Sequence, residues 1–189
     1  MGYLSNSKLD ELGISYGKNV LVSDKASIYG GSNIVIGDNV RIDDFCILSG
    51  VNGYINLHSH IHVAAFVSMF GAAGIVMEDF TAISSYSVIY SVSDNYDGNS
   101  LIGPVMDEDC LDIIKGEVKI RKYASCGTHS VLLPGVIMNE GSILGACSLA
   151  NRNLDEWSIY VGTPAKKNKK RDNGLLDKSH LMIERWKKR

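Results

Sequence analysis

The chain has 189 residues, of which 45% are hydrophobic and 21% are charged, and its formal net charge is −2. This composition fits one globular domain with a real core. No stretch approaches the length of a transmembrane helix, and the N-terminus lacks the apolar run of a secretory signal, so we expect a cytoplasmic protein with reduced thiols and no membrane span.

The first segment, residues 1–19, is expected to cap the N-terminal end of the fold. Its sequence is typical of a short amphipathic helix that ends at Gly13. The repeats that follow cannot bury their own end, so a capping segment of this kind is needed.

Residues 20–165 carry a six-residue repeat that predicts the fold. From Ile120 to Ala150, a residue of suitable size recurs at every sixth position: Ile120, Cys126, Leu132, Met138, Leu144 and Ala150. An amphipathic helix repeats at three and four residues and an alternating strand at two, so neither explains this spacing. A period of six is typical of a parallel β-helix, in which three hexads make one turn, whereas an ordinary β-sandwich has no reason to hold it.

The same period recurs upstream, interrupted by short slips. The sets that keep it are Val22, Ile28 and Ile34; Ile36, Ile42 and Leu48; Leu57, Val63 and Met69; and Met77, Ile83 and Ile89. Gly and Asn residues between them suit tight corners, because both tolerate a positive φ. We therefore expect an all-β fold over residues 20–165.

The repeat is interrupted once, from 91 to 116. This segment contains no hexad and six acidic residues, Asp94, Asp97, Asp107, Glu108, Asp109 and Asp112. A long loop within a compact repeat domain is usually functional or disordered. We expect it to project from one corner of the β-helix, either as part of a site or as a solvated excursion.

The last segment, residues 166–189, is a basic tail that is expected to be helical. It holds ten Lys or Arg residues against three acidic ones. From Leu175 onward, apolar residues fall along one side of a helix. Nucleic-acid or membrane-surface binding is one interpretation. A docked helix with its basic side toward solvent or a phosphorylated ligand is the preferred one.

The residues at the end of the repeat resemble the hexapeptide-repeat acyltransferases, and within that family the sugar O-acetyltransferases for galactosides and maltose. The resemblance covers roughly residues 20–170. Its most specific parts are the run from Leu133 to Val136 and the closing Gly162-Thr163-Pro164-Ala165-Lys166. It implies a left-handed β-helix, a homotrimer, and acetyl-CoA as the acyl donor in a groove between neighbouring copies.

The resemblance also indicates which residues line the donor groove. Family members use the small residues after the hexad glycines, which are Thr128 after Gly127 and Ala146 after Gly145. Thr128 and Ala146 are one turn apart and should stack. Thr163 and Pro164 of the closing sequence are also assigned to the donor groove. Lys166 is expected to contact the nucleotide phosphates of acetyl-CoA. All are equally explained as ordinary corner or tail residues.

Acyl transfer to a hydroxyl or amine requires a base near neutral pKa, for which histidine is best suited. The galactoside and maltose enzymes carry theirs in the projecting loop, but the loop of this chain has no histidine. His62 precedes the inward Val63 and should face outward, so we take it as the general base, ahead of His60 and His129. Asp94 is expected to orient the base or hold the acceptor, and Tyr96 to stack on a sugar.

The sequence thus predicts an acetyltransferase that modifies a sugar or nucleotide-linked sugar by direct transfer. It leaves open the identity of the acceptor and whether oxygen or nitrogen is acetylated. One alternative is a non-catalytic β-helix that serves as a binding or assembly subunit. The other is a zinc enzyme like the γ-type carbonic anhydrases, suggested by His58, His60 and His62. Because alternate residues of one strand do not converge on a metal, we expect no metal site.

Overall fold

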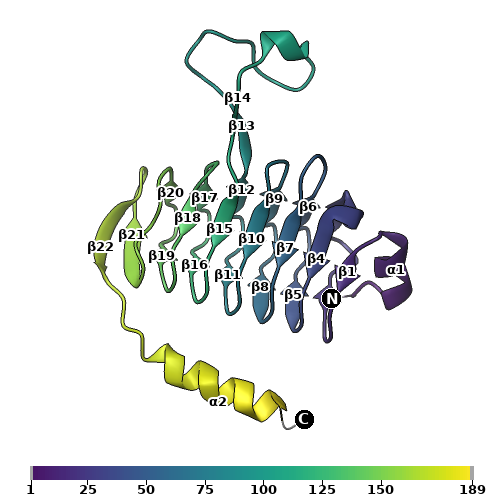
Figure 1. The fold of residues 1–189 in the computed structure, drawn as a ribbon, viewed down its shortest axis with the longest axis vertical. Helices are drawn as coiled ribbons and strands as arrows, with labels where there is room; N and C mark the ends of the chain where they lie inside the picture. Colours follow the sequence, from purple (N-terminus) through teal and green to yellow (C-terminus); the bar gives the residue numbers. More distant parts are fainter. Residues whose placement is uncertain (1, 188–189) are drawn as a thin grey trace.

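The computed structural model describes residues 2–187, which wind into a left-handed parallel β-helix (Figure 1). Three sheets form the flat sides of a triangular prism, and all their strands are parallel except the last strand of face 2. The chain passes from face 1 to face 2 to face 3 in each turn. We name the corners by the faces they join: corner 1–2, corner 2–3 and corner 3–1. The expected fold, with its projecting loop and C-terminal helix, is confirmed.

Each face is built from short strands that pair with the equivalent strand of the next turn. Face 1 consists of β1 (Ser15–Tyr16), β4 (Ile34–Ile36), β7 (Ile55–Leu57), β10 (Ile75–Met77), β15 (Val118–Ile120) and β18 (Ile137–Met138). Face 2 consists of β2 (Leu21–Val22), β5 (Val40–Ile42), β8 (Ile61–Val63), β11 (Ala82–Ile83), β16 (Ser125–Cys126), β19 (Ile143–Leu144), β21 (Ser158–Val161) and β22 (Lys166–Lys170). Face 3 consists of β3 (Ser27–Tyr29), β6 (Ile47–Ser49), β9 (Ser68–Phe70), β12 (Val88–Tyr90), β17 (Val131–Leu132) and β20 (Leu149–Ala150).

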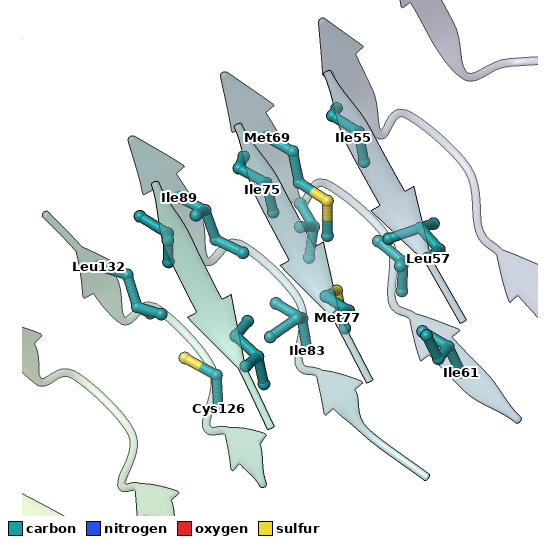
Figure 2. Close-up of a cluster of buried hydrophobic side chains, with 14 of the residues drawn as sticks. Ile55, Leu57, Ile61, Met69, Ile75, Met77, Ile83, Ile89, Cys126 and Leu132 are labelled. Carbon is teal, nitrogen blue, oxygen red and sulfur yellow. The ribbon is translucent and has the colours of Figure 1, made fainter. Parts of the chain in front are cut away.

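The core is a column of aliphatic side chains inside the triangle. Ile83, Ile89 and Cys126 come from different strands and point into the same interior (Figure 2). Every residue of the six-residue pattern between Ile120 and Ala150 is at most 1% exposed. Upstream, the pattern residues are equally buried except Ile28, which packs only partly against the core. The period of six therefore identifies the core correctly. Full burial of one such side chain stabilises the fold by about 1.5–3 kcal/mol.

The slips in the period have a single structural origin. Leu48 and the next inward pattern residue, Leu57, are nine positions apart, and Met69 and Met77 are eight apart. Both intervals span corner 3–1, where the early turns carry extra residues, including the 3₁₀ turn Gly31–Asn33. The later turns have no such additions and keep the period of six. The inserted residues therefore accumulate at the corner from which the long loop emerges.

Aromatic residues stack along two corners in a backbone conformation that they normally avoid. At corner 2–3, Phe45, Phe66, Tyr86 and His129 all have φ between 56° and 63°. Their rings stack in sequence with centroid distances of 5.0, 4.7 and 4.8 Å. A positive φ is unfavourable for bulky side chains, and ring stacking between successive turns offsets that strain. We call these four residues the corner 2–3 aromatic stack.

The N-terminal end is closed by helix α1 (Asn6–Glu11), which buries Leu9 against the first turn. The Ser5 side chain accepts a hydrogen bond from the backbone N–H of Lys8 and caps the helix. Gly13 follows the helix with φ of +76°, which is the left-handed conformation common just after a helix. The short helix expected before Gly13 is therefore present.

The basic tail divides into two elements. Residues 166–170 do not belong to a helix but form β22, which pairs antiparallel with β21 and covers the last turn of face 2. Helix α2 (Leu175–Lys187) then runs along corner 1–2, where the Ser179 hydroxyl lies 2.9 Å from the Tyr123 hydroxyl. The Trp186 ring packs edge-on against His60. Residues 188–189, at the end of the expected tail, lie outside the described part of the chain.

Candidate active site

The segment 91–116 leaves the β-helix at corner 3–1 as an antiparallel hairpin (Figure 1). Its stem consists of β13 (Val92–Asp94) and β14 (Ile113–Lys115), and a short 3₁₀ turn, η2 (Glu108–Cys110), lies in the projecting part. The segment thus contains regular secondary structure and is not a structureless excursion. We refer to residues 91–116 as the hairpin.

Asp94 ends the first strand of the hairpin, where it lies directly opposite Ile113. Its side chain is partly buried, and Oδ1 accepts a hydrogen bond of 3.4 Å from the backbone N–H of Gly103. The carboxylate borders a cavity of about 380 Å³ between the hairpin and corner 3–1. This volume falls within the range of small-molecule pockets. Tyr96, by contrast, does not line the cavity and is 71% exposed.

The predicted donor residues lie at corner 2–3, in the turns that follow the hairpin. The backbone N–H of Cys147 donates to the carbonyl of Thr128, so the segments holding Thr128 and Ala146 stack in consecutive turns. The Thr128 hydroxyl donates to the Ser85 carbonyl at 2.7 Å, which links it to the turn before. Ala146 is exposed, and its small side chain leaves the backbone of the corner accessible.

Close packing between successive turns requires glycine at positions 127 and 145. A Cβ atom on Gly127 would lie 2.5 Å from the backbone nitrogen of Ala146. A Cβ atom on Gly145 would lie 2.7 Å from the Val161 side chain. Both positions require the close approach of two turns, so the spacing of the coils alone accounts for these two residues.

The closing sequence continues the same corner by one more turn. The Thr163 hydroxyl donates to the Cys147 carbonyl at 3.4 Å, and the peptide bond between Thr163 and Pro164 is cis. Lys166 is exposed and pairs through its backbone with Val161. Thr128, Ala146 and Thr163 therefore form a row along corner 2–3, with Lys166 beyond its end.

A ladder of buried serines lies inside corner 2–3 and was not recognised in the sequence. Ser87 donates to the Gly127 carbonyl at 2.9 Å, and Ser130 donates to the Gly145 carbonyl at 2.8 Å. The Ser148 hydroxyl accepts from the Gly162 backbone N–H at 2.9 Å. The three hydroxyls fix the backbone directly behind the row of donor candidates. Ser130 and Ser148 are 18 positions apart, which is one turn and was the available signal, whereas the hairpin separates Ser87 from Ser130 by 43 positions.

The cysteines of this region differ in their suitability as nucleophiles. Cys126 is 1% exposed, and burial raises the pKa of its thiol to about 11. A thiol with that pKa is protonated at neutral pH and is a poor nucleophile. Cys147 is exposed at corner 2–3. The buried Cys126 is therefore poorly suited to form an acyl-enzyme.

His62 lies on the outer surface of face 2, as expected from the inward Val63 beside it. Its Nε2 is 2.8 Å from Oδ2 of Asp43, and the Arg41 Nε donates to the other oxygen of that carboxylate at 2.6 Å. Burial tends to raise the pKa of Asp43, but hydrogen bonds from His62 and Arg41 outweigh it and hold that pKa below its ordinary value. Asp43 therefore stays ionised and fixes the imidazole, which leaves Nδ1 available for proton transfer.

The other histidines lie at corners or on the tail helix. His60 and His129 occupy the same position within a turn but at different corners, His60 at corner 1–2 and His129 in the corner 2–3 aromatic stack. His58 and His180 are exposed. Within residues 2–187, no group of three His, Cys, Asp or Glu side chains is arranged to hold a metal ion.

The structure does not bring His62 and Asp94 together within one chain. Face 2 is the side of the triangle opposite corner 3–1, where the hairpin begins. The two residues nevertheless lie at nearly the same level along the axis. His62 pairs directly with Ala82, and Ala82 lies in the turn that ends in the hairpin. His62 and Asp94 therefore lie on opposite sides of one prism at a similar axial level.

Comparison with known proteins assigns the chain to a family. No family model matches it. The chain is 42% identical over 178 residues to the dTDP-4-amino-4,6-dideoxy-D-glucose acyltransferase of Escherichia coli, a match that covers 94% of this chain and 93% of that protein. This chain belongs to the hexapeptide-repeat sugar acyltransferases. It is thus an enzyme of the acyltransferase class, as predicted.

Solved structures agree with this assignment. The fold matches AntD, an N-acyltransferase from Bacillus cereus, in a serine variant bound to dTDP-4-amino-4,6-dideoxyglucose and coenzyme A. In that comparison the TM-score is 0.92 and the identity 40%, over 96% of this chain and 97% of AntD. AntD bound to dTDP and 3-hydroxybutyryl-CoA matches with a TM-score of 0.94 and 39% identity, over 98% of both chains.

The similarity to the O-acetyltransferases is more distant. A maltose O-acetyltransferase from Clostridium difficile is 19% identical with a TM-score of 0.57, over 88% of this chain and 74% of that one. This likeness concerns the fold alone. The strongly similar relatives are instead named for an amino sugar and for N-acylation.

Proposed function

We propose that this enzyme transfers an acyl group, the acetyl group of acetyl-CoA, to the amine of a nucleotide-linked amino sugar such as dTDP-4-amino-4,6-dideoxyglucose. The observation that carries the proposal is the partly buried Asp94 carboxylate beside the hairpin cavity. A carboxylate attracts an ammonium group and accepts hydrogen bonds from an amine. The high identity to enzymes named for this sugar supports the same acceptor.

The row at corner 2–3 is the proposed donor site. Thr128, Ala146 and Thr163 repeat from turn to turn, so the corner offers the same backbone groups at regular intervals along its length. Such a row suits the extended pantetheine arm of coenzyme A, which carries two amides. Lys166, beyond the end of the row, is proposed to meet the nucleotide phosphates as a point charge.

In the proposed reaction, the ammonium group attracted by Asp94 first releases one proton to solvent. The neutral amine then attacks the thioester carbonyl, and a carbon–nitrogen bond forms. The tetrahedral intermediate collapses as the carbon–sulfur bond breaks, and the amine proton passes to the leaving sulfur to give the free thiol of coenzyme A. Asp94 orients the nitrogen. His62 is proposed as the group that takes the proton and returns it, because Asp43 fixes its ring with Nδ1 free.

Because Asp94 and the donor row lie at different corners, we propose that the active unit is a homotrimer with a site between neighbouring copies. In such a ring, the hairpin of one copy meets corner 2–3 and face 2 of the next. A homotrimer accounts for the shared axial level of Asp94 and His62, and a closed ring repeats one interface three times.

The proposed cytoplasmic location rests on the cysteines of the described residues and not on the helices. None of the helices described in residues 2–187 is long and apolar enough to cross a lipid bilayer. Cys46, Cys110, Cys126 and Cys147 are all free thiols. Free thiols persist in a reducing compartment, which supports the proposed cytoplasmic location.

The test is a transfer assay monitored by mass spectrometry. The enzyme is incubated with acetyl-CoA and either dTDP-4-amino-4,6-dideoxyglucose or dTDP-glucose, which lacks the amine. The proposal predicts one added acetyl group on the amino sugar and none on dTDP-glucose, with 3-hydroxybutyryl-CoA as a second donor for comparison. Acetylation of dTDP-glucose, or of neither sugar, would contradict it.

A further inference from the structure

The hairpin cavity is bordered by charges of opposite sign that come from the two strands of its stem. Its lining includes Asn52, Ala72, Val92, Asp94, Pro104 and Lys115. Asp94 is the acidic member and Lys115 the basic one. The cavity therefore offers a site for an anion as well as for the acceptor amine.

The strand register places these two side chains on the same side of the stem. Asp94 pairs with Ile113, and Val92 pairs with Lys115. Because alternate residues of a strand share one side, Asp94 and Val92 face the same way, and their partners face with them. Asp94 and Lys115 are therefore diagonal neighbours, and such positions are typically separated by about 7–8 Å in an antiparallel ladder.

The two charges do not neutralise each other. Across residues 2–187, no ion pair joins Lys115 to Asp94 or to another carboxylate, whereas the nearby Lys119 pairs with Glu117 at 2.6 Å. Lys115 is exposed, and its ammonium group remains available to a ligand. An uncompensated lysine beside a ligand cavity is well placed to bind an anion.

The charge of the hairpin makes this lysine more significant. Lys115 is the sole Lys or Arg between positions 91 and 116, among six acidic residues. Those carboxylates repel any phosphate that approaches the cavity, at distances within a Debye length of about 8–10 Å. Without Lys115, the hairpin would bind a cationic amino sugar that carries no phosphate more favourably than one that carries a phosphate.

We infer that Lys115 binds the diphosphate of the acceptor while Asp94 holds its amine, so that the cavity selects amino sugars bearing both groups. In a 4-amino sugar linked to a nucleotide through carbon 1, the amine and the phosphate lie at opposite ends of the ring. This arrangement matches the diagonal separation of the two side chains. The inference rests on the proposed function and adds a residue that determines specificity.

The experiment compares Lys115→Met with Lys115→Arg and with Lys122→Met as a matched control. Lys115→Met removes the charge but keeps an apolar side chain of similar length. Lys122 is also exposed but lies at corner 1–2, away from the hairpin. Binding of dTDP and of dTDP-4-amino-4,6-dideoxyglucose is measured by calorimetry at two salt concentrations. Transfer kinetics are measured with the nucleotide-linked sugar and with free 4-amino-4,6-dideoxyglucose.

Lys115→Met is expected to weaken binding of both nucleotides, and to raise KM for the linked sugar, by about ten-fold. Its kcat and its activity on the free sugar should be unchanged, and binding should lose part of its salt dependence. Lys115→Arg and Lys122→Met should resemble the parent enzyme. A purely structural role for Lys115 would instead lower activity on both sugars equally.

Unchanged dTDP binding by Lys115→Met, with normal transfer by the parent enzyme, would overturn the inference and leave the proposed function intact. A parent enzyme that acylates the free sugar but does not bind dTDP would also overturn it. A parent enzyme that acylates neither sugar would overturn the proposed function, and the inference with it.

Discussion

Single residues at the corners and on the hairpin carry both the shape and the proposed chemistry of this molecule. Asp94 ends a strand that projects from the β-helix, so its carboxylate reaches beyond the prism while its backbone is held in a ladder. Asp43 has a different task, since it fixes His62 on face 2 through a hydrogen bond of 2.8 Å. The two carboxylates are predicted to respond differently to substitution.

Replacing Asp94 with Asn should reduce kcat/KM for the amino sugar by at least about a hundredfold, because the amide carries no charge to attract the amine. The measurement is steady-state transfer from acetyl-CoA. Asp107→Asn, which neutralises an exposed carboxylate elsewhere on the hairpin, is the matched control and should be nearly unaffected. Equal losses in the two variants would mean that general charge matters, not this position.

Replacing His62 with Ala should lower turnover by at least the roughly hundredfold typical of losing a general base. His58→Ala, which removes an exposed histidine from the same turn, should retain activity. Near-normal turnover of the His62 variant would exclude this residue as the base. An unaltered pH profile of the remaining activity would show that His62 does not transfer the proton.

Replacing Asp43 with Asn should destabilise the protein at neutral pH by about 1 kcal/mol, because the hydrogen bonds from His62 and Arg41 then reach a neutral acceptor. The pKa of Asp43 lies below its ordinary value of 3.8, so the stabilisation is present above that value. It is lost as the pH falls through the folded-state pKa. Denaturant unfolding at several pH values should show the difference at pH 7 and its disappearance in strong acid. A difference that persists in strong acid would contradict this explanation.

At the level of elements, the six-residue period predicted the strands and their inward residues because each side chain has one geometric place in a repeating turn. Ile83 and Leu132 could be assigned to the core from spacing alone. The period could not predict the hairpin stem, whose pairing depends on contacts outside the repeat. The period also could not predict the contact between His62 and Asp43, because the two residues lie 19 positions apart in the sequence.

The corner 2–3 aromatic stack leads to a prediction about stability. Phe66 lies between Phe45 and Tyr86 with φ of 63°. Phe66→Asn keeps a residue that tolerates this backbone conformation but removes both ring contacts, and should cost about 1–3 kcal/mol. Phe66→Tyr keeps the stack and should be close to neutral. Urea unfolding measures both variants, and an equal effect of the two would indicate that stacking is not the stabilising interaction.

At the level of the whole molecule, the proposed donor row and the hairpin do not meet within one chain. The donor row at corner 2–3 and the Asp94 carboxylate at corner 3–1 lie along different edges of the same prism. Family membership and the implied coenzyme A donor could be inferred from the closing sequence. The proposed meeting of the hairpin with the donor row of another copy depends on how copies assemble, which a repeat pattern within one chain does not encode.

Complementation between two inactive variants tests the central claim most directly. Asp94→Asn disables the hairpin, and Ala146→Trp fills the exposed corner of the donor row. The two variants are produced together, and acetyl transfer to dTDP-4-amino-4,6-dideoxyglucose is measured. Random mixing in a closed trimer leaves about a quarter of the interfaces with an intact hairpin and an intact groove. Recovery toward that fraction of parent activity is the predicted result, and a mixture as inactive as each variant alone would contradict a site shared between copies.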